Sequence, residues 1–297
     1  EGDVIFLDNV RKNEEEYGPT YSTNKETEET DIVATLSSVS DVFVTDAFAA
    51  AHRRSPTLTG FTHSLPCIAG KLMQKEISNL RTALRDPPSP YLAILGGAKC
   101  DDSVRVALNL LSKERVDTIA FVGVTGNLML WADGADIGER NKEFIRNTLG
   151  KDFDIAWDMS KKIISDYQEK AFLPVDVATL HEGKRHPILV SDLPTEDPIY
   201  DVGIQTLRTL KPLVQNAGCI LWNGPASYFE LPEFAFGTIE ILNMCTETEA
   251  MTIIGGGHTS ALVNSRGVSD QVTHNSTGGG STMSFLSGDS MPVIASL

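Results

Sequence analysis

The sequence has no cysteine pair, no excess of basic residues and no long apolar run, and each absence excludes a class of protein. Its four cysteines are far apart and form no C-x-x-C motif, so neither a zinc site nor a disulfide framework is expected. The net charge of −15 opposes binding to nucleic acid or to an anionic membrane. No run of about 18 apolar residues is present to span a bilayer, and we expect a cytoplasmic protein.

The sequence also lacks an initiator methionine. It opens on Glu1 and passes at once into a strand pattern at Asp3–Leu7. No capping segment precedes this strand pattern, which is what a cut through a domain would leave. We therefore expect a fragment of a longer protein that begins inside a domain.

Apolar runs and helical patterns alternate along most of the chain. From residue 91 onward, strands are expected at 91–95, 118–122, 187–190, 219–222 and 251–254. One long helical pattern covers 141–172. Buried strands that alternate with helices predict an α/β fold with a doubly wound parallel sheet.

The first part of the chain has a similar but shorter pattern. A helical pattern at 32–39 precedes a strand at 42–45, and a second helical pattern at 69–84 ends at the proline-rich stretch Asp86–Pro90. Because a stiff turn follows this second helix and a new series of elements begins there, a domain boundary is expected at this point.

Three glycine clusters follow strand patterns and precede helical ones: Gly96–Lys99 (GGAK), Gly255–Thr259 (GGGHT) and Thr277–Gly280 (TGGG). Glycine lets the backbone approach an anion, and a helix that starts there directs N–H groups and a partial positive charge at it. Ligands of doubly wound sheets bind at the carboxyl ends of the strands. These clusters therefore predict phosphate sites, although the third also fits a flexible linker.

Other residues carry weaker signals. The positive charge of Lys99 is unfavourable at a helix start, because the helix dipole is positive there. Its presence at this position therefore indicates an anionic ligand. The segment Trp222–Pro225 (WNGP) fits either a nucleotide contact or a simple turn, and Glu230 fits either a ribose contact or a surface acid. Arg11 and Arg53 follow strand patterns, where arginine suits phosphate recognition, although a lone arginine is commonly a surface residue.

Seven blocks occur together in this chain: LDNVR at 7–11, TDAFAAAHR at 45–53, LGGAKCDDS at 95–103, LPVD at 173–176, WNGP at 222–225, IGGGHT at 254–259 and STGGG at 276–280. In this order they resemble phosphoglycerate kinase, most closely its archaeal form, without roughly the N-terminal quarter. The resemblance implies phosphoryl transfer between 1,3-bisphosphoglycerate and ADP, giving 3-phosphoglycerate and ATP. The alternative is a nucleotide-binding homologue without turnover.

The resemblance also implies roles for single residues. Catalytic roles fall to Lys99, Gly257 and Gly280. Nucleotide binding falls to Gly97, Ala98, Lys99, Gly203, Asn223, Pro225, Glu230, Gly255, Gly256, Gly257, His258 and Thr259. Phosphoglycerate binding falls to Arg11, His52, Arg53, Thr277, Gly278 and Gly279. Because His258 stands where bacterial and eukaryotic members have a metal-linked Asp, Mg²⁺ is expected to arrive with the nucleotide, and no residue is assigned as a metal ligand.

For the whole chain, the resemblance implies two doubly wound, Rossmann-like parallel-sheet lobes joined by a hinge helix, with the N-terminal lobe incomplete. The expected divisions are a phosphoglycerate-binding remainder at 1–68, a hinge at 69–90, a nucleotide-binding domain at 91–272 and a C-terminal segment at 273–297 that returns to the first lobe. The expected partners are these small molecules alone, with no nucleic acid or membrane, for a monomer or homodimer.

Overall fold

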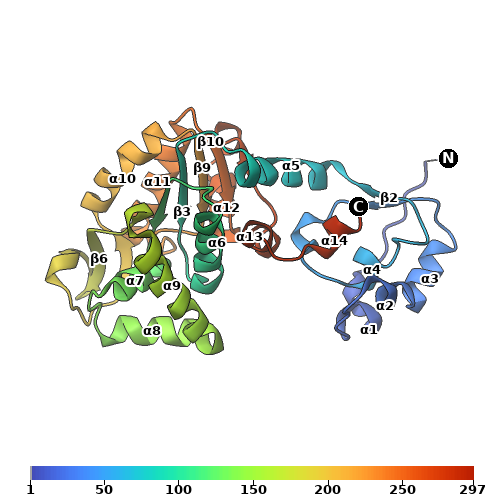
Figure 1. Ribbon diagram of the computed structural model, residues 1–297, viewed down its shortest axis with the longest axis horizontal. Helices are drawn as coiled ribbons and strands as arrows, with labels where there is room; N and C mark the ends of the chain where they lie inside the picture. Colours follow the sequence, from blue (N-terminus) through green and yellow to red (C-terminus); the bar gives the residue numbers. More distant parts are fainter. Residues whose placement is uncertain (1) are drawn as a thin grey trace. The chain divides into compact units, whose positions relative to one another are not determined.

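The computed structural model describes residues 2–297, which form two compact units (Figure 1). The first unit extends to Ser78 and includes Asp289–Leu297, and the second is Asn79–Gly288. The boundary lies inside one helix, α5 (Lys71–Arg85), which corresponds to the helix expected at 69–84. Its apolar side includes Met73, Ile77 and Leu80, all of which are buried.

The second unit is built on a six-stranded parallel sheet in the order β11-β10-β9-β3-β4-β5. Its strands are β3 (Tyr91–Leu95), β4 (Thr118–Phe121), β5 (Ala171–Phe172), β9 (Cys219–Asn223), β10 (Met251–Gly255) and β11 (His274–Asn275). Every residue of β3 and β9 is buried, as expected for strands covered on both faces. The predicted α/β fold with a parallel sheet is therefore confirmed.

Helices cover both faces of this sheet. Figure 1 shows α10 (Ile204–Asn216) and α11 (Phe236–Thr246) on one side and α6 (Cys100–Ser112) on the other. Alternate strand residues, including Trp222, form one hydrophobic core with residues of α10, α11 and α12 (Gly257–Ser265). On the other side, α6 packs against α9 (Phe153–Tyr167) and α13 (Gly280–Ser287).

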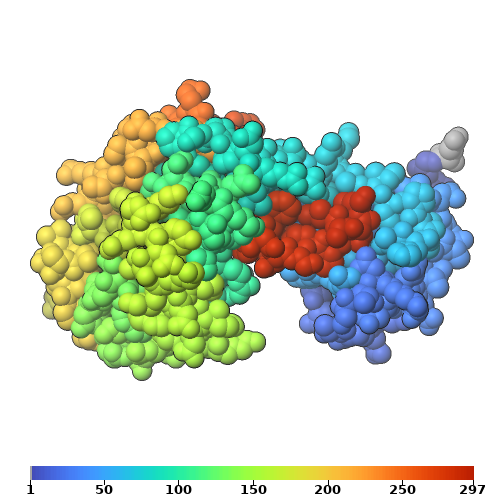
Figure 2. Space-filling model, in the orientation of Figure 1, coloured from blue at the N-terminus to red at the C-terminus, as the bar shows by residue number. Residues whose placement is uncertain are grey.

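The prediction of a single long helix over 141–172 is wrong. The segment contains α8 (Glu139–Leu149), a 3-10 turn at Gly150–Asp152, and α9. Gly150 has a φ of +52°, a left-handed conformation that ends α8. The chain can therefore turn, and α9 packs on α7 (Gly123–Asp133). Figure 2 shows α8 and α9, coloured green to yellow-green, on the surface of this unit.

A small antiparallel sheet, which the sequence did not predict, extends the second unit. Its order is β7-β6-β8, with β6 (Asp176–His181), β7 (Lys184–Leu189) and β8 (Ile199–Val202). Glu182 and Gly183 join β6 to β7 with φ angles of 46° and 78°. Two consecutive positive φ angles are typical of a tight hairpin turn. The strand expected at 187–190 is the end of β7.

The first unit has a two-stranded parallel sheet, β1 (Phe43–Thr45) and β2 (Cys67–Ala69), so the strand expected at 42–45 is confirmed. Its helices are short: α1 (Glu14–Tyr17), α2 (Asn24–Glu28), α3 (Asp31–Ser37), α4 (Pro56–Thr59) and α14 (Pro292–Ala295). The C-terminal α14, red in Figure 2, packs against α4.

Further short 3-10 helices occur in both units. They are Val10–Lys12, Phe48–Ala50, Gln168–Lys170, Val190–Asp192, Pro232–Phe234 and Ser269–Gln271.

The strand expected at Asp3–Leu7 is wrong. These residues form no strand, and Val4, Ile5 and Phe6 expose 78%, 82% and 93% of their surface. A continuous apolar run such as Val4–Leu7 becomes a strand only when another strand satisfies its backbone groups. No strand pairs with this segment among residues 2–297.

Candidate functional site

The carboxyl ends of three neighbouring strands bring the glycine-containing loops together. In the sheet register, Asn223 at the end of β9 lies between Leu95 of β3 and Gly255 of β10. The loops that follow are bonded to one another: the Gly96 N–H donates to the Asn223 carbonyl at 2.8 Å, and the Gly97 N–H donates to the Pro225 carbonyl at 2.8 Å. Segments far apart in the sequence therefore form one surface at the edge where doubly wound sheets bind ligands.

A cavity of about 890 Å³ opens at this edge. The predicted nucleotide-site residues that line it are Gly97, Ala98, Lys99, Asn223, Pro225, Glu230, Gly256, Gly257, His258 and Thr259, together with Gly279 and Gly280. The size is within the usual range for a small-molecule site. All three glycine clusters therefore contribute to one cavity, which makes a flexible linker at 277–280 the poorer interpretation.

Two of these glycines have conformations or neighbours that exclude a side chain. A Cβ atom at Gly96 would lie 2.6 Å from the Pro225 carbonyl oxygen. Gly256 has a φ of +85°, and a Cβ there would lie 3.0 Å from Thr259 Oγ1. Because both backbones approach other groups so closely, the glycines are needed to shape the cavity wall.

Helix N-termini at the cavity supply positive electrostatic potential. α12 begins at Gly257 and α13 at Gly280, and both residues line the cavity. The Thr259 hydroxyl donates to the Gly255 carbonyl at 2.6 Å and accepts from the Gly224 N–H at 3.2 Å, which fastens the start of α12 to the strand ends. Two fixed helix starts beside one cavity suit an anion with several oxygens.

Lys99 adds a full positive charge. It occupies the N-cap position of α6 without a side-chain cap hydrogen bond, is exposed and lines the cavity. Within residues 2–297 no carboxylate forms an ion pair with it. Its ammonium group is therefore available to an anionic ligand.

Asn223 has a buried acceptor that no protein group satisfies. Its Oδ1 atom has no hydrogen-bond partner within the described part of the chain, and the residue lines the cavity. A buried acceptor without a donor destabilises the fold by about 1–3 kcal/mol. A ligand that donates a hydrogen bond at this position would remove that penalty.

The sequence did not predict the aromatic part of the cavity. Phe144 of α8 lines the cavity and exposes 55% of its surface. Tyr200 of β8 and Tyr228 also line the cavity, and the centres of their rings are 5.3 Å apart. An apolar face exposed in a cavity suits a flat, hydrophobic ligand group. No pattern distinguishes these rings from core aromatics, but Gly123, another lining residue, follows β4 as Gly96 follows β3 and could have been recognised.

Four predicted residues of the second unit do not line the cavity: Gly203, Gly255, Thr277 and Gly278. At Gly203 a Cβ would lie 2.0 Å from the carboxyl carbon of Asp176, whose oxygens accept from the N–H groups of Gln205 and Thr206. Gly203 therefore lets Asp176 approach the start of α10. Gly255 ends β10, and Thr277 and Gly278 precede α13.

Three of the six predicted phosphoglycerate residues, Arg11, His52 and Arg53, lie in the first unit. Arg11 is exposed, with its guanidinium 4.4 Å from the centre of the Tyr17 ring, and Arg53 is also exposed. His52 is half-buried. Burial and the neighbouring Arg53 lower the pKa of His52, so at neutral pH its imidazole is uncharged and the arginines carry the positive charge.

Two further observations concern the described residues as a whole. Residues 2–297 contain no group of three or more His, Cys, Asp or Glu side chains placed to hold a metal ion. No helix in that range is long and apolar enough to span a membrane.

Comparison with known proteins identifies the family. A family model for phosphoglycerate kinase matches residues 1–289. The chain is 40% identical to a phosphoglycerate kinase of Methanothermus fervidus, with 99% of this chain and 70% of that protein covered. It is 38% identical to that of Methanocorpusculum labreanum, with 100% and 72% covered.

Solved structures agree with these matches. The phosphoglycerate kinase from Pyrococcus horikoshii has a TM-score of 0.89 at 35% identity, covering 97% of this chain and 71% of that one. The enzyme from Coxiella burnetii has a TM-score of 0.76 at 29% identity, covering 92% and 68%. The chain thus spans about 70% of the length of its relatives. It belongs to the phosphoglycerate kinase family of phosphotransferases.

Proposed function

We propose that this chain catalyses the reversible transfer of a phosphoryl group between the acyl phosphate of 1,3-bisphosphoglycerate and ADP. The bond between phosphorus and the carboxyl oxygen breaks, and a bond from phosphorus to a β-phosphate oxygen of ADP forms. The products are 3-phosphoglycerate and ATP, so the acceptor in the reverse direction is a carboxylate. The observation that carries the proposal is the single cavity lined by all three glycine clusters and Lys99.

The cavity has separate regions suited to the two ends of a nucleotide. We place the base near Gly97, Ala98 and the apolar wall that includes Phe144 and Tyr228. Asn223 and Glu230 offer acceptors for the ribose hydroxyls, and Asn223 Oδ1 needs a donor in any case. The phosphates then lie at the start of α12, where Gly257 and His258 are exposed.

The chemical step requires charge stabilisation more than an acid or a base, because the transferred group carries its negative charge on three equatorial oxygens. In our proposal Lys99 follows that charge, and the N-termini of α12 at Gly257 and α13 at Gly280 donate N–H groups to it. These donors are fixed by the fold before the substrate arrives, which lowers the reorganisation needed during transfer.

We place the phosphoglycerate with Arg11, His52 and Arg53 of the first unit, and the role of Thr277–Gly279 stays a prediction from the resemblance. Arginine binds phosphate and carboxylate oxygens in a bidentate manner. A neutral His52 contributes a hydrogen bond rather than a charge. Bringing two substrates together from two units requires a hinge, for which residues 69–90, containing the boundary at Ser78, remain our prediction.

Mg²⁺ would neutralise nucleotide phosphate charge during transfer. Mg²⁺ prefers oxygen ligands in octahedral geometry and commonly keeps several waters. Because His258 is the side chain exposed at the start of α12, we propose that the ion enters with the nucleotide, held by phosphate oxygens and water.

We also propose a cytoplasmic location, in keeping with four free cysteines of which three are buried, and a monomer or homodimer.

Two measurements on the unchanged chain test the proposal. Calorimetric titration with ADP measures nucleotide binding, and a coupled assay with 3-phosphoglycerate, ATP and MgCl₂ measures turnover. We expect both to be positive. Because the chain spans about 70% of its relatives' length, binding without turnover is the second candidate, and it would identify a nucleotide-binding homologue. Absence of ADP binding would overturn both candidates.

A further inference from the structure

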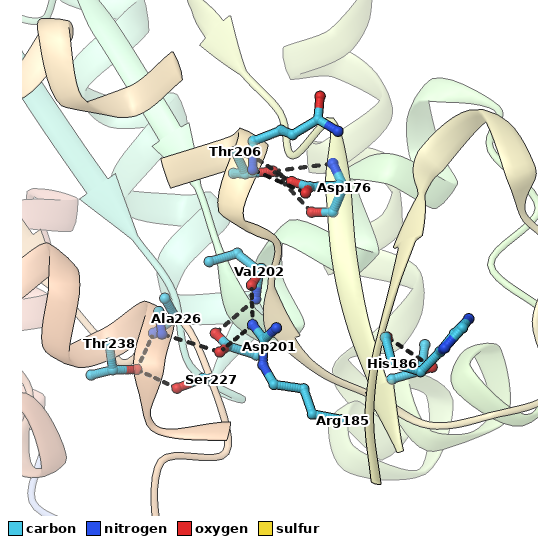
Figure 3. A network of polar contacts seen from close by, with 12 residues as sticks. Asp176, Arg185, His186, Asp201, Val202, Thr206, Ala226, Ser227 and Thr238 are labelled. Carbon is cyan, nitrogen blue, oxygen red and sulfur yellow. Dashed lines mark hydrogen bonds and ion pairs between the residues drawn. The ribbon is translucent and has the colours of Figure 1, made fainter. Parts of the chain in front are cut away.

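A buried ion pair lies in the wall of the cavity, outside the residues assigned to substrates. Arg185 of β7 donates from Nη2 to Asp201 Oδ2 of β8 at 3.0 Å and to the Val202 carbonyl at 3.0 Å (Figure 3). The Asp201 side chain has no exposed surface, and that of Arg185 exposes only 20%. Asp201 and Val202 both line the cavity.

The pair connects strands that are not neighbours. The sheet order is β7-β6-β8, so Arg185 reaches across the middle strand to Asp201. Ala178 of β6 is the residue paired with Asp201, and its methyl group leaves room for the long side chain. An ion pair at this distance fixes β8 against the rest of the small sheet in addition to the strand hydrogen bonds.

Asp201 also holds the start of α11. Its Oδ2 atom accepts from the Gly237 N–H at 3.1 Å, and its Oδ1 atom accepts from the Val202 N–H at 2.8 Å. Gly237 is in the first turn of α11, where a carboxylate is stabilised by the helix dipole. A Cβ at Gly237 would lie 2.1 Å from Asp201 Oδ1, so this approach depends on glycine.

From α11 the contacts continue to the loop that lines the cavity. Thr238 Oγ1 accepts from the Ala226 N–H at 3.1 Å and is hydrogen-bonded to the Ser227 hydroxyl at 2.6 Å (Figure 3). The Tyr228 N–H donates to the Tyr200 carbonyl at 2.7 Å, which returns the chain of contacts to β8. Ser227, Tyr228 and Tyr200 all line the cavity.

We infer that Asp201 and Arg185 are positioning residues for the nucleotide, because their ion pair fixes β8, the start of α11 and the loop Pro225–Tyr228 as one wall of the cavity. The inference rests on the proposed function, which places the nucleotide in this cavity. A buried ion pair is often no more stabilising than apolar residues of similar volume. A large gain in stability therefore does not explain the Asp201–Arg185 pair, whereas the geometry of the wall does.

The contacts require an ionised Asp201. Its two oxygens accept three donors, so a proton on either oxygen displaces at least one of them. Arg185 from β7 is the charged group that acts on it, whereas α11 and β8 contribute uncharged N–H groups and β6 contributes Ala178. Burial, the largest effect, raises the pKa of Asp201 to about 6. Acidification below that value therefore loosens the wall.

The test compares ADP affinity of the full chain and its variants by calorimetric titration. Asp201→Asn keeps the shape but loses the charge, and we expect it to weaken ADP binding about tenfold. Arg185→Met should have a similar effect, and Arg185→Lys, which keeps the charge, should recover part of the loss. In the unchanged chain ADP affinity should fall between pH 7 and pH 5, whereas Asp201→Asn should show a smaller change.

Thr206→Val is the matched control. It removes hydrogen bonds to the buried Asp176 in the same unit without altering a residue of the cavity wall. We expect it to lower the melting temperature and leave ADP affinity unchanged.

The inference is overturned if Asp201→Asn and Arg185→Met fold and bind ADP like the unchanged chain, or if Thr206→Val weakens binding equally. If Asp201→Asn does not fold, the two Arg185 variants decide the question. Absence of ADP binding to the unchanged chain overturns the proposed function, and this inference with it.

Discussion

Lys99 is the residue at which we expect nucleotide binding and turnover to separate. It is exposed at the cavity, and no protein carboxylate neutralises it within residues 2–297. In our proposal its charge is needed most when the phosphoryl group is between donor and acceptor, so Lys99→Ala should lower turnover by about 100-fold or more and retain most ADP affinity. The coupled assay and the ADP titration measure the two effects.

Lys113→Ala provides the control for this prediction. Lys113 is also exposed and caps the opposite end of α6, away from the residues that line the cavity. Lys113→Ala should change neither turnover nor ADP affinity. Full activity in Lys99→Ala would exclude Lys99 from the mechanism.

Asp201 should also give stability a specific pH dependence. Because its folded pKa, about 6, is above the ordinary value of 3.8, the folded chain binds more protons than the unfolded chain between these pH values. The free energy of unfolding contributed by Asp201 is therefore present in full below pH 3.8 and is lost as the pH rises through about 6. The slope from one such group is at most about 1.4 kcal/mol per pH unit.

Urea unfolding between pH 4 and pH 7 measures this contribution. Other carboxyl groups titrate in the same range, so the informative quantity is the difference between the unchanged chain and Asp201→Asn. The free energy of unfolding of the unchanged chain minus that of Asp201→Asn should decrease as the pH rises toward 6. A difference that is constant with pH would show that Asp201 titrates alike in the folded and unfolded chain.

Single residues could be predicted from the sequence where function leaves a local mark. Gly97 and Lys99, which line the cavity, could be singled out because glycine at a strand end allows a close approach of the backbone and a lysine at a helix start opposes the helix dipole. Asp201 and Arg185 were missed because their partnership depends on the register of three strands. Phe144 was missed because an apolar residue on a helix is normally a core residue.

At the scale of elements, the start of α12 links glycine geometry to the cavity. Gly256 has a φ of +85°, so Gly256→Ala introduces backbone strain of about 1–2 kcal/mol. Its Cβ would also lie 3.1 Å from Asn223 Oδ1 and 3.3 Å from the Gly224 nitrogen. We expect lower stability in urea unfolding together with weaker ADP binding.

Gly267 is the matched position at the other end of α12. It has a φ of +67°, but a Cβ at this position would have no atom within 4 Å, so Gly267→Ala adds strain without changing the cavity. It should lower stability and leave ADP affinity unchanged. Equal affinities for the two variants would mean that the α12 start does not contact the nucleotide.

Four strands of the main sheet, β3, β4, β9 and β10, were predicted because continuous apolar runs mark strands that are buried on both faces, whereas the two-residue strands β5 and β11 were missed. The strands at 91–95 and 219–222 were found for this reason. The small antiparallel sheet was missed because all residues of β7 are half-buried or exposed and apolar residues do not alternate regularly with polar ones. Asp3–Leu7 shows the opposite error, because a strand pattern without a pairing strand forms no strand and stays exposed.

At the scale of the whole molecule, the order of the motifs was more informative than any one of them. Seven short blocks in sequence indicated the family, and with it the α/β fold, although each block alone allowed a turn or a surface explanation. Local patterns carry less information about which distant segments pack together. Asp289–Leu297 belongs with the first unit, whereas residues 273–288 belong with the second.

The C-terminal residues should therefore stabilise the first unit alone. Val293 of α14 is fully buried, and its N–H donates to the Ala51 carbonyl at 3.4 Å. Val293→Ala removes buried methyl groups and should destabilise the first unit by about 2 kcal/mol. Leu297→Ala, at a position with 44% of its surface exposed, is the control and should have little effect.

Differential scanning calorimetry with and without ADP distinguishes the two units. A ligand raises the melting temperature of the unit that binds it, so the transition that ADP shifts belongs to Asn79–Gly288. Val293→Ala should lower the melting temperature of the other transition and leave the ADP-dependent one in place. If the variant lowers the ADP-dependent transition equally, the two units unfold as one cooperative structure, and the C-terminal residues stabilise both.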